Sequence, residues 1–150
     1  MTDTLSPERR SQLMAKIHGK DTAIEKKVRS YLHKKGYRFR KHVAALPGSP
    51  DIVLPTCKAA IFIHGCFWHG HYGCRKSRLP TARRSFWEEK RQANLERDAR
   101  KISDLINFGW RVAVVWQCAL EKPTTLAHTM DMLEDWINSE KTRCEIPDGR

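Results

Sequence analysis

The sequence has no long apolar run, and no stretch approaches the ~18 consecutive apolar residues that a membrane-spanning helix needs. Its first residues include Asp3 and Glu8 and no apolar segment, so they do not look like a secretory signal. Acidic residues are also few, with 17 Asp and Glu against 28 Lys and Arg and a formal net charge of +11. We therefore expect a cytoplasmic protein, not associated with a membrane, whose partner is a polyanion such as nucleic acid.

Cysteine is scarce and odd in number, with five residues in a chain of 150. An odd count without an export signal argues against a disulfide framework and favours reduced thiols, some of them bound to a metal. Cys57 and Cys144 are interpreted as bystanders. Internal repeats and low-complexity linkers are absent as well, and the length suits one compact domain over residues 1–150.

Helix and strand signals alternate along the chain. Capping-box patterns at Thr22/Glu25 and Ser85/Glu88 predict the starts of two helices. Two short, continuously apolar runs are typical of central strands that are covered on both faces. The order of the elements predicts a three-layer α/β/α domain with a central mixed sheet. The expected helices are 6–19, 22–36, 85–108 and 124–137, and the expected strands are 37–40, 51–54, 59–63 and 111–116.

Potential metal ligands are concentrated directly after Ile63, where three histidines and two cysteines fall between His64 and Cys74. Tetrahedral Zn²⁺ takes Cys and His ligands, and a structural site has four of them. Spacing allows a local site, or one in which Cys118 joins and a histidine is released. Cys118 follows an expected buried strand, which favours the second arrangement with His69 released; a surface loop without metal is the alternative. The five candidates are Cys66, His69, His71, Cys74 and Cys118.

Two carboxylates are candidates for chemistry. Asp51 opens an expected strand directly after a turn, where a carboxylate can hold Mg²⁺; capping of the turn is the alternative. Asp98 shares a helix face with apolar residues, and a carboxylate in such a stripe needs a partner. That partner is either a histidine acting as a base, whose tautomer the carboxylate fixes, or a neighbouring arginine, Arg91 or Arg97.

Two aromatic pairs, Phe67–Trp68 and Phe86–Trp87, flank the basic stretch 75–84. Aromatic side chains that project from a loop can insert between DNA bases. Packing in the core is the alternative, because it is the usual fate of Phe and Trp.

These residues resemble the very-short-patch repair endonucleases over nearly the whole chain. The resemblance implies a restriction-endonuclease-like fold and a nick in the T-bearing strand, 5′ of the thymine, at T:G mismatches left by deaminated 5-methylcytosine. The alternatives are a non-catalytic zinc-stabilised DNA-binding module and a restriction-like nuclease with another DNA substrate. The motifs that carry the resemblance are Leu46–Asp51, His64–His69, Phe86–Trp87, Asn94–Asp98 and Gly109–Val112.

The resemblance also implies catalytic roles. It makes Asp51 the principal Mg²⁺ ligand, assisted by the backbone carbonyl of Ile63, at a position where the family pattern has threonine. His69 becomes the general base, which Asp98 orients, and His64 assists near the scissile phosphate.

The remaining implied roles concern a helix start, zinc and DNA. Glu25 would act through the water shell of the metal, although it is also explained as the capping-box partner of Thr22. The resemblance further implies a monomer acting at the nucleoid on double-stranded DNA with a T:G mismatch, with MutL-type mismatch-repair proteins and a repair polymerase as candidate partners. The implied zinc ligands are Cys66, His71, Cys74 and Cys118, in a loop shifted by one residue. The implied DNA contacts are Phe67, Trp68 and Trp87 as a wedge, Lys90 and Asn94 at the mismatched pair, and Met14 within a DNA-contacting segment 1–20.

Overall fold

The structure is a computed structural model and describes residues 22–147. Met14, the segment 1–20 and the helix expected at 6–19 lie outside the described residues. The described helices are α2 (Ala23–Lys34), α3 (Arg84–Asn107) and α4 (Pro123–Ile137). The described strands are β1 (Arg40–Lys41), β2 (Ile52–Leu54), β3 (Ala59–His64), β4 (Arg111–Trp116) and β5 (Arg143–Ile146).

The strands form one mixed sheet in the order β1-β2-β3-β4-β5. β1 pairs antiparallel with β2, and β2 pairs antiparallel with β3. β3, β4 and β5 run parallel to one another, and His64 at the end of β3 lies opposite Trp116 at the end of β4. The loops that follow β3 and β4 therefore leave the sheet at the same edge.

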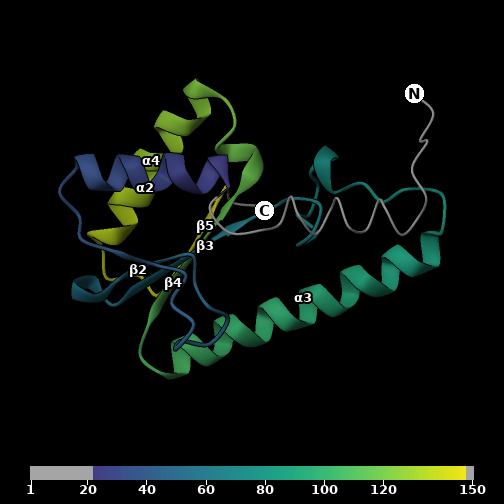
Figure 1. Ribbon diagram of the computed structural model, residues 1–150, viewed down its shortest axis with the longest axis horizontal. Coiled ribbons are helices and arrows are strands. Elements are labelled where there is room, and N and C mark those ends of the chain that lie inside the picture. Colours follow the sequence, from purple (N-terminus) through teal and green to yellow (C-terminus); the bar gives the residue numbers. More distant parts are fainter. Residues whose placement is uncertain (1–21, 148–150) are drawn as a thin grey trace.

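Helices cover both faces of the sheet, so the predicted three-layer α/β/α arrangement is confirmed (Figure 1). Because successive side chains of a strand point to opposite faces, Ile61 of β3 packs with α2 and α4, whereas Phe62 packs with Leu105 of α3. All six residues of β3 are buried, as expected of a central strand. Within residues 22–147, no helix combines the length and the apolar character that crossing a membrane requires.

Three details of the predicted secondary structure are wrong. The first strand lies at Arg40–Lys41 instead of 37–40, and Tyr37 donates its hydroxyl hydrogen bond to Glu134. The capping box expected at Ser85 does not form, because α3 already starts at Arg84, after an N-cap residue that makes no side-chain hydrogen bond. β5 was not predicted at all, and it places Cys144 partly buried against the core.

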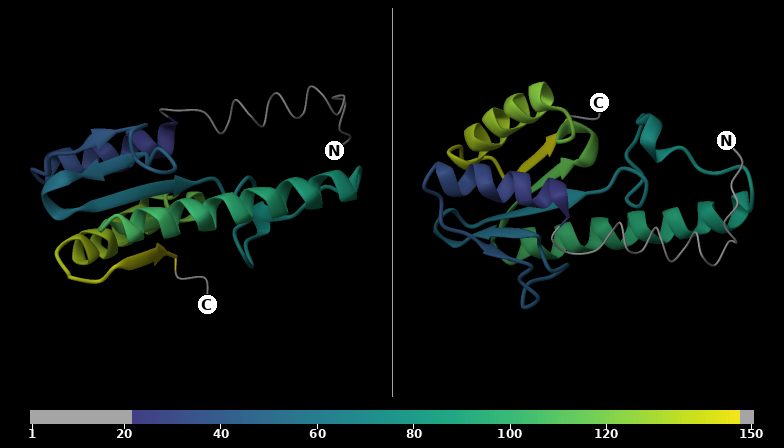
Figure 2. Two further views of the ribbon diagram at one scale, coloured as in Figure 1. Left: turned by 90° about the horizontal axis from the view of Figure 1, so that it is seen from below. Right: turned by 45° about the horizontal axis from the view of Figure 1, so that its top comes forward.

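The length of α3 determines where the site lies. Its 24 residues correspond to ~36 Å of helix. The C-terminal half packs on the sheet through Leu105, while the N-terminal half extends past the end of the sheet (Figure 2). The segment that joins β3 to α3 runs along this extension (Figure 2), so side chains of α3 can hydrogen-bond to that loop.

Candidate active site and metal centre

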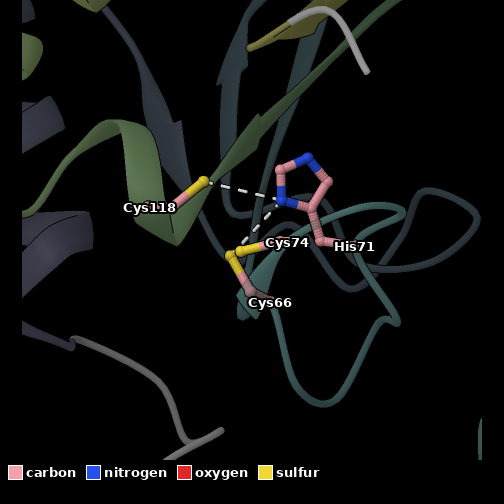
Figure 3. A group of neighbouring side chains, drawn as sticks. All are labelled: Cys66, His71, Cys74 and Cys118. Carbon is pink, nitrogen blue, oxygen red and sulfur yellow. Dashed lines mark hydrogen bonds between the residues drawn. The ribbon is translucent and has the colours of Figure 1, made fainter. Parts of the chain in front are cut away.

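Four side chains from the predicted zinc set meet beside the ends of β3 and β4; we call them the thiol cluster (Cys66, His71, Cys74 and Cys118). Their ligand atoms all lie within 4.8 Å of one another. Nδ1 of His71 is 3.6 Å from the Cys66 sulfur and 3.5 Å from the Cys118 sulfur (Figure 3). The parallel pairing of β3 with β4 explains why Cys118, far away in sequence, joins the loop residues.

Burial controls the protonation of the thiol cluster. Loss of hydration raises the pKa of the Cys66 thiol and of the Cys118 thiol, and it lowers the pKa of His71. The imidazole is thus neutral, as a metal ligand must be, and the thiols need a positive charge nearby before they ionise. Three sulfur atoms and one nitrogen form a donor set that fits a tetrahedral metal ion.

The indole ring of Trp116 packs against the thiol cluster. His71 stacks on this indole with ring centroids 4.2 Å apart and an angle of 10°. The Trp116 indole N–H donates to the Glu145 carboxylate at 2.8 Å, which fixes the indole from the β5 side. His64 meets another side of the same indole edge-on, at 5.2 Å. Trp116 therefore contacts both the thiol cluster, through His71, and His64.

His69 is outside the thiol cluster and forms a histidine–carboxylate pair with Asp98. Its Nδ1 lies 2.6 Å from the Asp98 carboxylate, a short hydrogen bond between side chains that are 11% and 14% exposed. The ring of His69 also stacks on His64 at 3.8 Å, nearly parallel at 6°. The alternative partners of Asp98 have other contacts, since Arg91 donates to the Phe67 carbonyl and Arg97 to Asn94.

Side chains on one face of α3 form hydrogen bonds with three consecutive loop residues, 67–69. The Arg91 guanidinium donates to the Phe67 carbonyl at 3.0 Å, and the Asn94 amide donates to the Trp68 carbonyl at 2.9 Å. Asp98 then binds the ring of residue 69. Spacings of three and four residues put these side chains on one helical face. The sequence analysis considered Arg91 only as an alternative partner of Asp98 and assigned it no role in holding the loop, because the loop's position along α3 follows from the fold.

A second group of possible metal ligands, which we call the carboxylate group, consists of Glu25, His42 and Asp51. The Ile63 amide donates to Asp51 at 2.7 Å. The N–H and the carbonyl of one strand residue point to the same side of the strand. The carbonyl of Ile63 therefore points toward Asp51, as its amide does. Burial raises the pKa of Asp51 to about 7, and the Glu25 charge adds to this while the Ile63 amide opposes it. A divalent cation would offset the charge of the buried Glu25 and the partly buried Asp51, so the group fits Mg²⁺.

The environment of Glu25 bears on its two expected roles. The Thr22 hydroxyl accepts a hydrogen bond from the Glu25 amide at 3.4 Å, so one half of the capping box is present. The Glu25 carboxylate contacts Arg29 at 3.5 Å and His42 at 3.4 Å. The backbone of Glu25 therefore takes part in capping while its side chain faces the carboxylate group. The sequence analysis did not single out His42, because a lone histidine after a two-residue strand carries no pattern.

A cavity of about 570 Å³ joins the carboxylate group to the histidine–carboxylate pair. Glu25 and Asp51 line one part of it, and His64, His69 and Asp98 line another. A histidine, the carboxylate that it contacts and a possible cation site thus open onto one space, an arrangement suited to hydrolysis of a phosphodiester.

The aromatic side chains lie beside this cavity and differ in exposure. Phe67 and Trp68 line the cavity and are partly exposed, whereas Trp87 is 5% exposed beneath them. Ring centroids of Trp87 lie 5.5 Å from Phe67 and 6.4 Å from Trp68. Lys90 is exposed on α3, with its ammonium group 5.8 Å from the Phe86 ring. The partly exposed rings therefore rest on a buried one.

A basic α/β chain with a mixed sheet, a cavity of carboxylates and histidines, and an adjacent thiol cluster has the features of a restriction-endonuclease-like nuclease. Residues 2–76 match the family model of the DNA mismatch endonuclease Vsr. The chain therefore belongs to the Vsr family of DNA mismatch endonucleases, and it is a DNA endonuclease.

Individual relatives agree with this assignment. The DNA mismatch endonuclease Vsr of Escherichia coli K12 is 46% identical over 149 residues, which cover 97% of this chain and 94% of that protein. The type II nicking enzyme V.XorIIP of Xanthomonas oryzae pv. oryzae is 58% identical over 120 residues, covering 80% and 88% of the two chains. The type II nicking enzyme V.NmeAIP of Neisseria meningitidis is 41% identical over 133 residues, covering 89% and 94%.

Proposed function

We propose that this protein nicks the T-bearing strand of double-stranded DNA, 5′ of the thymine in a T:G mismatch, and so starts very-short-patch repair. The observation that carries the proposal is the 2.6 Å contact between His69 and Asp98 in the cavity that Asp51 also lines. Relatives bearing the names mismatch endonuclease and nicking enzyme support the same reaction.

In the proposed reaction, His69 is the general base. Its Nδ1–H donates to the Asp98 carboxylate, so Nε2 keeps a lone pair that can take a proton from the attacking water. Asp98 fixes this tautomer and stabilises the imidazolium that forms. His64, which stacks on His69 and lines the same cavity, would assist at the scissile phosphate.

Asp51 and the carbonyl of Ile63 would hold Mg²⁺, with Glu25 acting through its water shell. Mg²⁺ bound there would supply positive charge to the phosphate as its negative charge increases. Cys66, His71, Cys74 and Cys118 would hold a structural Zn²⁺, for which three sulfur ligands and one nitrogen ligand are appropriate.

For DNA recognition, we propose that Phe67 and Trp68 insert at the mismatch and that the ring of Trp87 supports or joins them. Lys90 and Asn94, one helical turn apart on α3, would read the mismatched pair from the major groove. Met14, in the proposed DNA-contacting segment 1–20, would act from the minor-groove side. The whole chain would act as one domain and as a monomer in the cytoplasm at the nucleoid, with MutL-type proteins and a repair polymerase downstream.

The deciding experiment incubates a T:G duplex, labelled on each strand in turn, with the protein and Mg²⁺. We expect one nick in the T-bearing strand, little cleavage of the matched T:A duplex, and loss of nicking in His69→Ala. His128→Ala, which changes an exposed histidine of α4, is the matched control and should nick normally. Equal cleavage of both duplexes would favour a restriction-like nuclease instead, and binding without a nick would favour a non-catalytic binding module.

A further inference from the structure

His42 belongs to the carboxylate group, yet the proposed reaction gives it no role. Its ring and the carboxylates of Glu25 and Asp51 each offer a ligand atom, all within 4.8 Å of one another. The backbone explains this position, because the His42 amide donates to the Asp51 carbonyl at 3.1 Å across the start of the β1–β2 pairing. The chain thus brings a nitrogen donor directly opposite the proposed magnesium ligand.

The two nitrogens of the His42 ring face different carboxylates, and Nδ1 is the nitrogen that faces Asp51. Its Nε2 lies 3.4 Å from Glu25 Oε2, and its Nδ1 lies 3.8 Å from Asp51 Oδ1. Both separations exceed the ~2.7–3.2 Å of an N–H···O hydrogen bond. An imidazole gives one nitrogen to an ion, here Nδ1. Two ligands that are each ~2.1 Å from one ion lie between ~3 Å apart at a right angle and ~4.2 Å apart on opposite sides, and the separation of Nδ1 from Asp51 falls within this range. His69 and Asp98, at 2.6 Å, form the contrasting case of a true hydrogen bond in the same cavity.

A purely ion-paired histidine explains this arrangement less well. Arg29 already places a guanidinium 3.5 Å from the same Glu25 oxygen, so the carboxylate has a positive charge nearby without the imidazole. The His42 side chain is only 11% exposed, and Glu25 beside it is 6% exposed. A partly buried imidazole between two carboxylates is a suitable nitrogen ligand for a divalent cation.

We propose that His42 is a nitrogen ligand of the divalent cation held by Asp51. This inference rests on the proposed function, which places a cation at Asp51. An imidazole ligand raises the affinity for first-row transition metals over Mg²⁺, more for Co²⁺ than for Mn²⁺, whereas carboxylate and carbonyl ligands suit Mg²⁺ and Mn²⁺ well. The site therefore accepts Mg²⁺ but binds Mn²⁺ and Co²⁺ with a larger preference than oxygen ligands alone would give.

The test adds Mn²⁺ to the full-length protein as purified and records pulsed electron paramagnetic resonance, which detects nitrogen bound directly to the ion. The main variant is His42→Asn, because position 42 has a positive φ of 50° and asparagine tolerates that left-handed conformation. His42→Gln is the second variant, and circular dichroism verifies that both are folded. His69→Asn is the matched control, because His69 belongs to the other histidine group in the cavity.

We expect a nitrogen coupling in the wild-type protein and in His69→Asn, and none in either folded His42 variant. Mn²⁺ affinity should fall about tenfold or more in the His42 variants, with a smaller loss for Mg²⁺. A coupling that survives in both His42 variants, or is absent from the wild-type protein with Mn²⁺ bound, overturns the inference. Asp51→Asn separates the two proposals: Mn²⁺ binding that is unchanged in this variant refutes the cation site at Asp51 itself.

Discussion

The thiol cluster and the histidine–carboxylate pair lie close together but differ in their access to the cavity. The cluster contacts Trp116 through His71, and the pair contacts His64, which itself packs against Trp116. None of the four thiol-cluster residues lines the cavity of about 570 Å³, whereas His69 and Asp98 both do. A closed set of four ligands contributes to folding, and an open group can receive substrate and water. The neighbouring histidines His69 and His71 therefore lie in different surroundings: His69 contacts Asp98 of α3, and His71 stacks on Trp116 of β4.

The largest expected effect comes from opening the thiol cluster. If the cluster binds zinc as proposed, Cys66→Ala should abolish zinc binding, destabilise the protein by about 3–5 kcal/mol and abolish nicking, because the loop that carries His69 is then no longer anchored. For a chain of this length that corresponds to a fall in Tm of roughly 10–15 °C. Metal analysis and thermal unfolding measure both effects.

Cys57→Ala is the matched control for this experiment, since Cys57 lies outside the thiol cluster and is only partly buried. It should keep its zinc and its nicking activity. Full zinc content in Cys66→Ala together with normal nicking would contradict the structural role of the cluster.

A more selective effect is expected from the histidine–carboxylate pair. Asp98→Asn keeps the shape of the side chain but no longer fixes the His69 tautomer or stabilises its positive charge, so nicking should slow by about 10²–10⁴-fold. This loss equals roughly 3–5 kcal/mol in the activation barrier. Zinc content and Tm should stay near the wild-type values, unlike in Cys66→Ala. Single-turnover nicking rates and metal analysis measure the difference.

Asp104→Asn, an exposed change on the same helix, serves as the control for Asp98 and should nick at the wild-type rate. If Asp98→Asn lost its zinc as well, the thiol cluster and the histidine–carboxylate pair would form one structural unit, and the contrast drawn between them would fail.

The sequence predicted the layers well because their signals are local. The apolar runs that became β3 and β4 are continuous, and helix periodicity marked α2 and α4. β5 was missed because it has four residues, of which only Ile146 is fully buried, and its pairing with β4 depends on a distant partner. The start of α3 was misplaced because a favourable capping pattern at Ser85 was overridden by the left-handed backbone at Arg83.

For the site, the density of metal ligands in the sequence predicted where a cluster lies. The sequence could not predict which side chains contact one another in space. The His/Cys loop was evident, and the structure brings Cys118 to it through strand pairing. The sequence left two alternatives for the partner of Asp98, a histidine or an arginine, and the fold shows that the partner is His69. His42 could not be found, because its place opposite Asp51 arises from an antiparallel pairing of two-residue length.

The smallest expected effect tests whether the open cavity really contains a charge that needs a cation. Burial raises the pKa of Asp51 to about 7 from its ordinary value of 3.8. A carboxyl whose folded-state pKa is raised stabilises the protein fully below its unfolded-state pKa, and this contribution is lost as the pH rises through the folded-state pKa. For a fully desolvated carboxyl, this rise would correspond to about 4 kcal/mol. Because the Asp51 side chain is 21% exposed, water screens part of the effect, and without Mg²⁺ the wild-type protein should lose about 1–2 kcal/mol relative to Asp51→Asn between about pH 4 and pH 8.

Denaturant unfolding of both proteins measures this difference, and contributions from other titrating groups largely cancel in the subtraction. Mg²⁺ added at about pH 8 should restore the wild-type protein but not Asp51→Asn, because only a carboxylate attracts the cation strongly. A difference that stays constant with pH would mean that Asp51 is hydrated as a surface carboxylate is. In that case the cavity would hold no charge for a cation to offset, and the contrast between a closed structural cluster and an open cation site would no longer follow from burial.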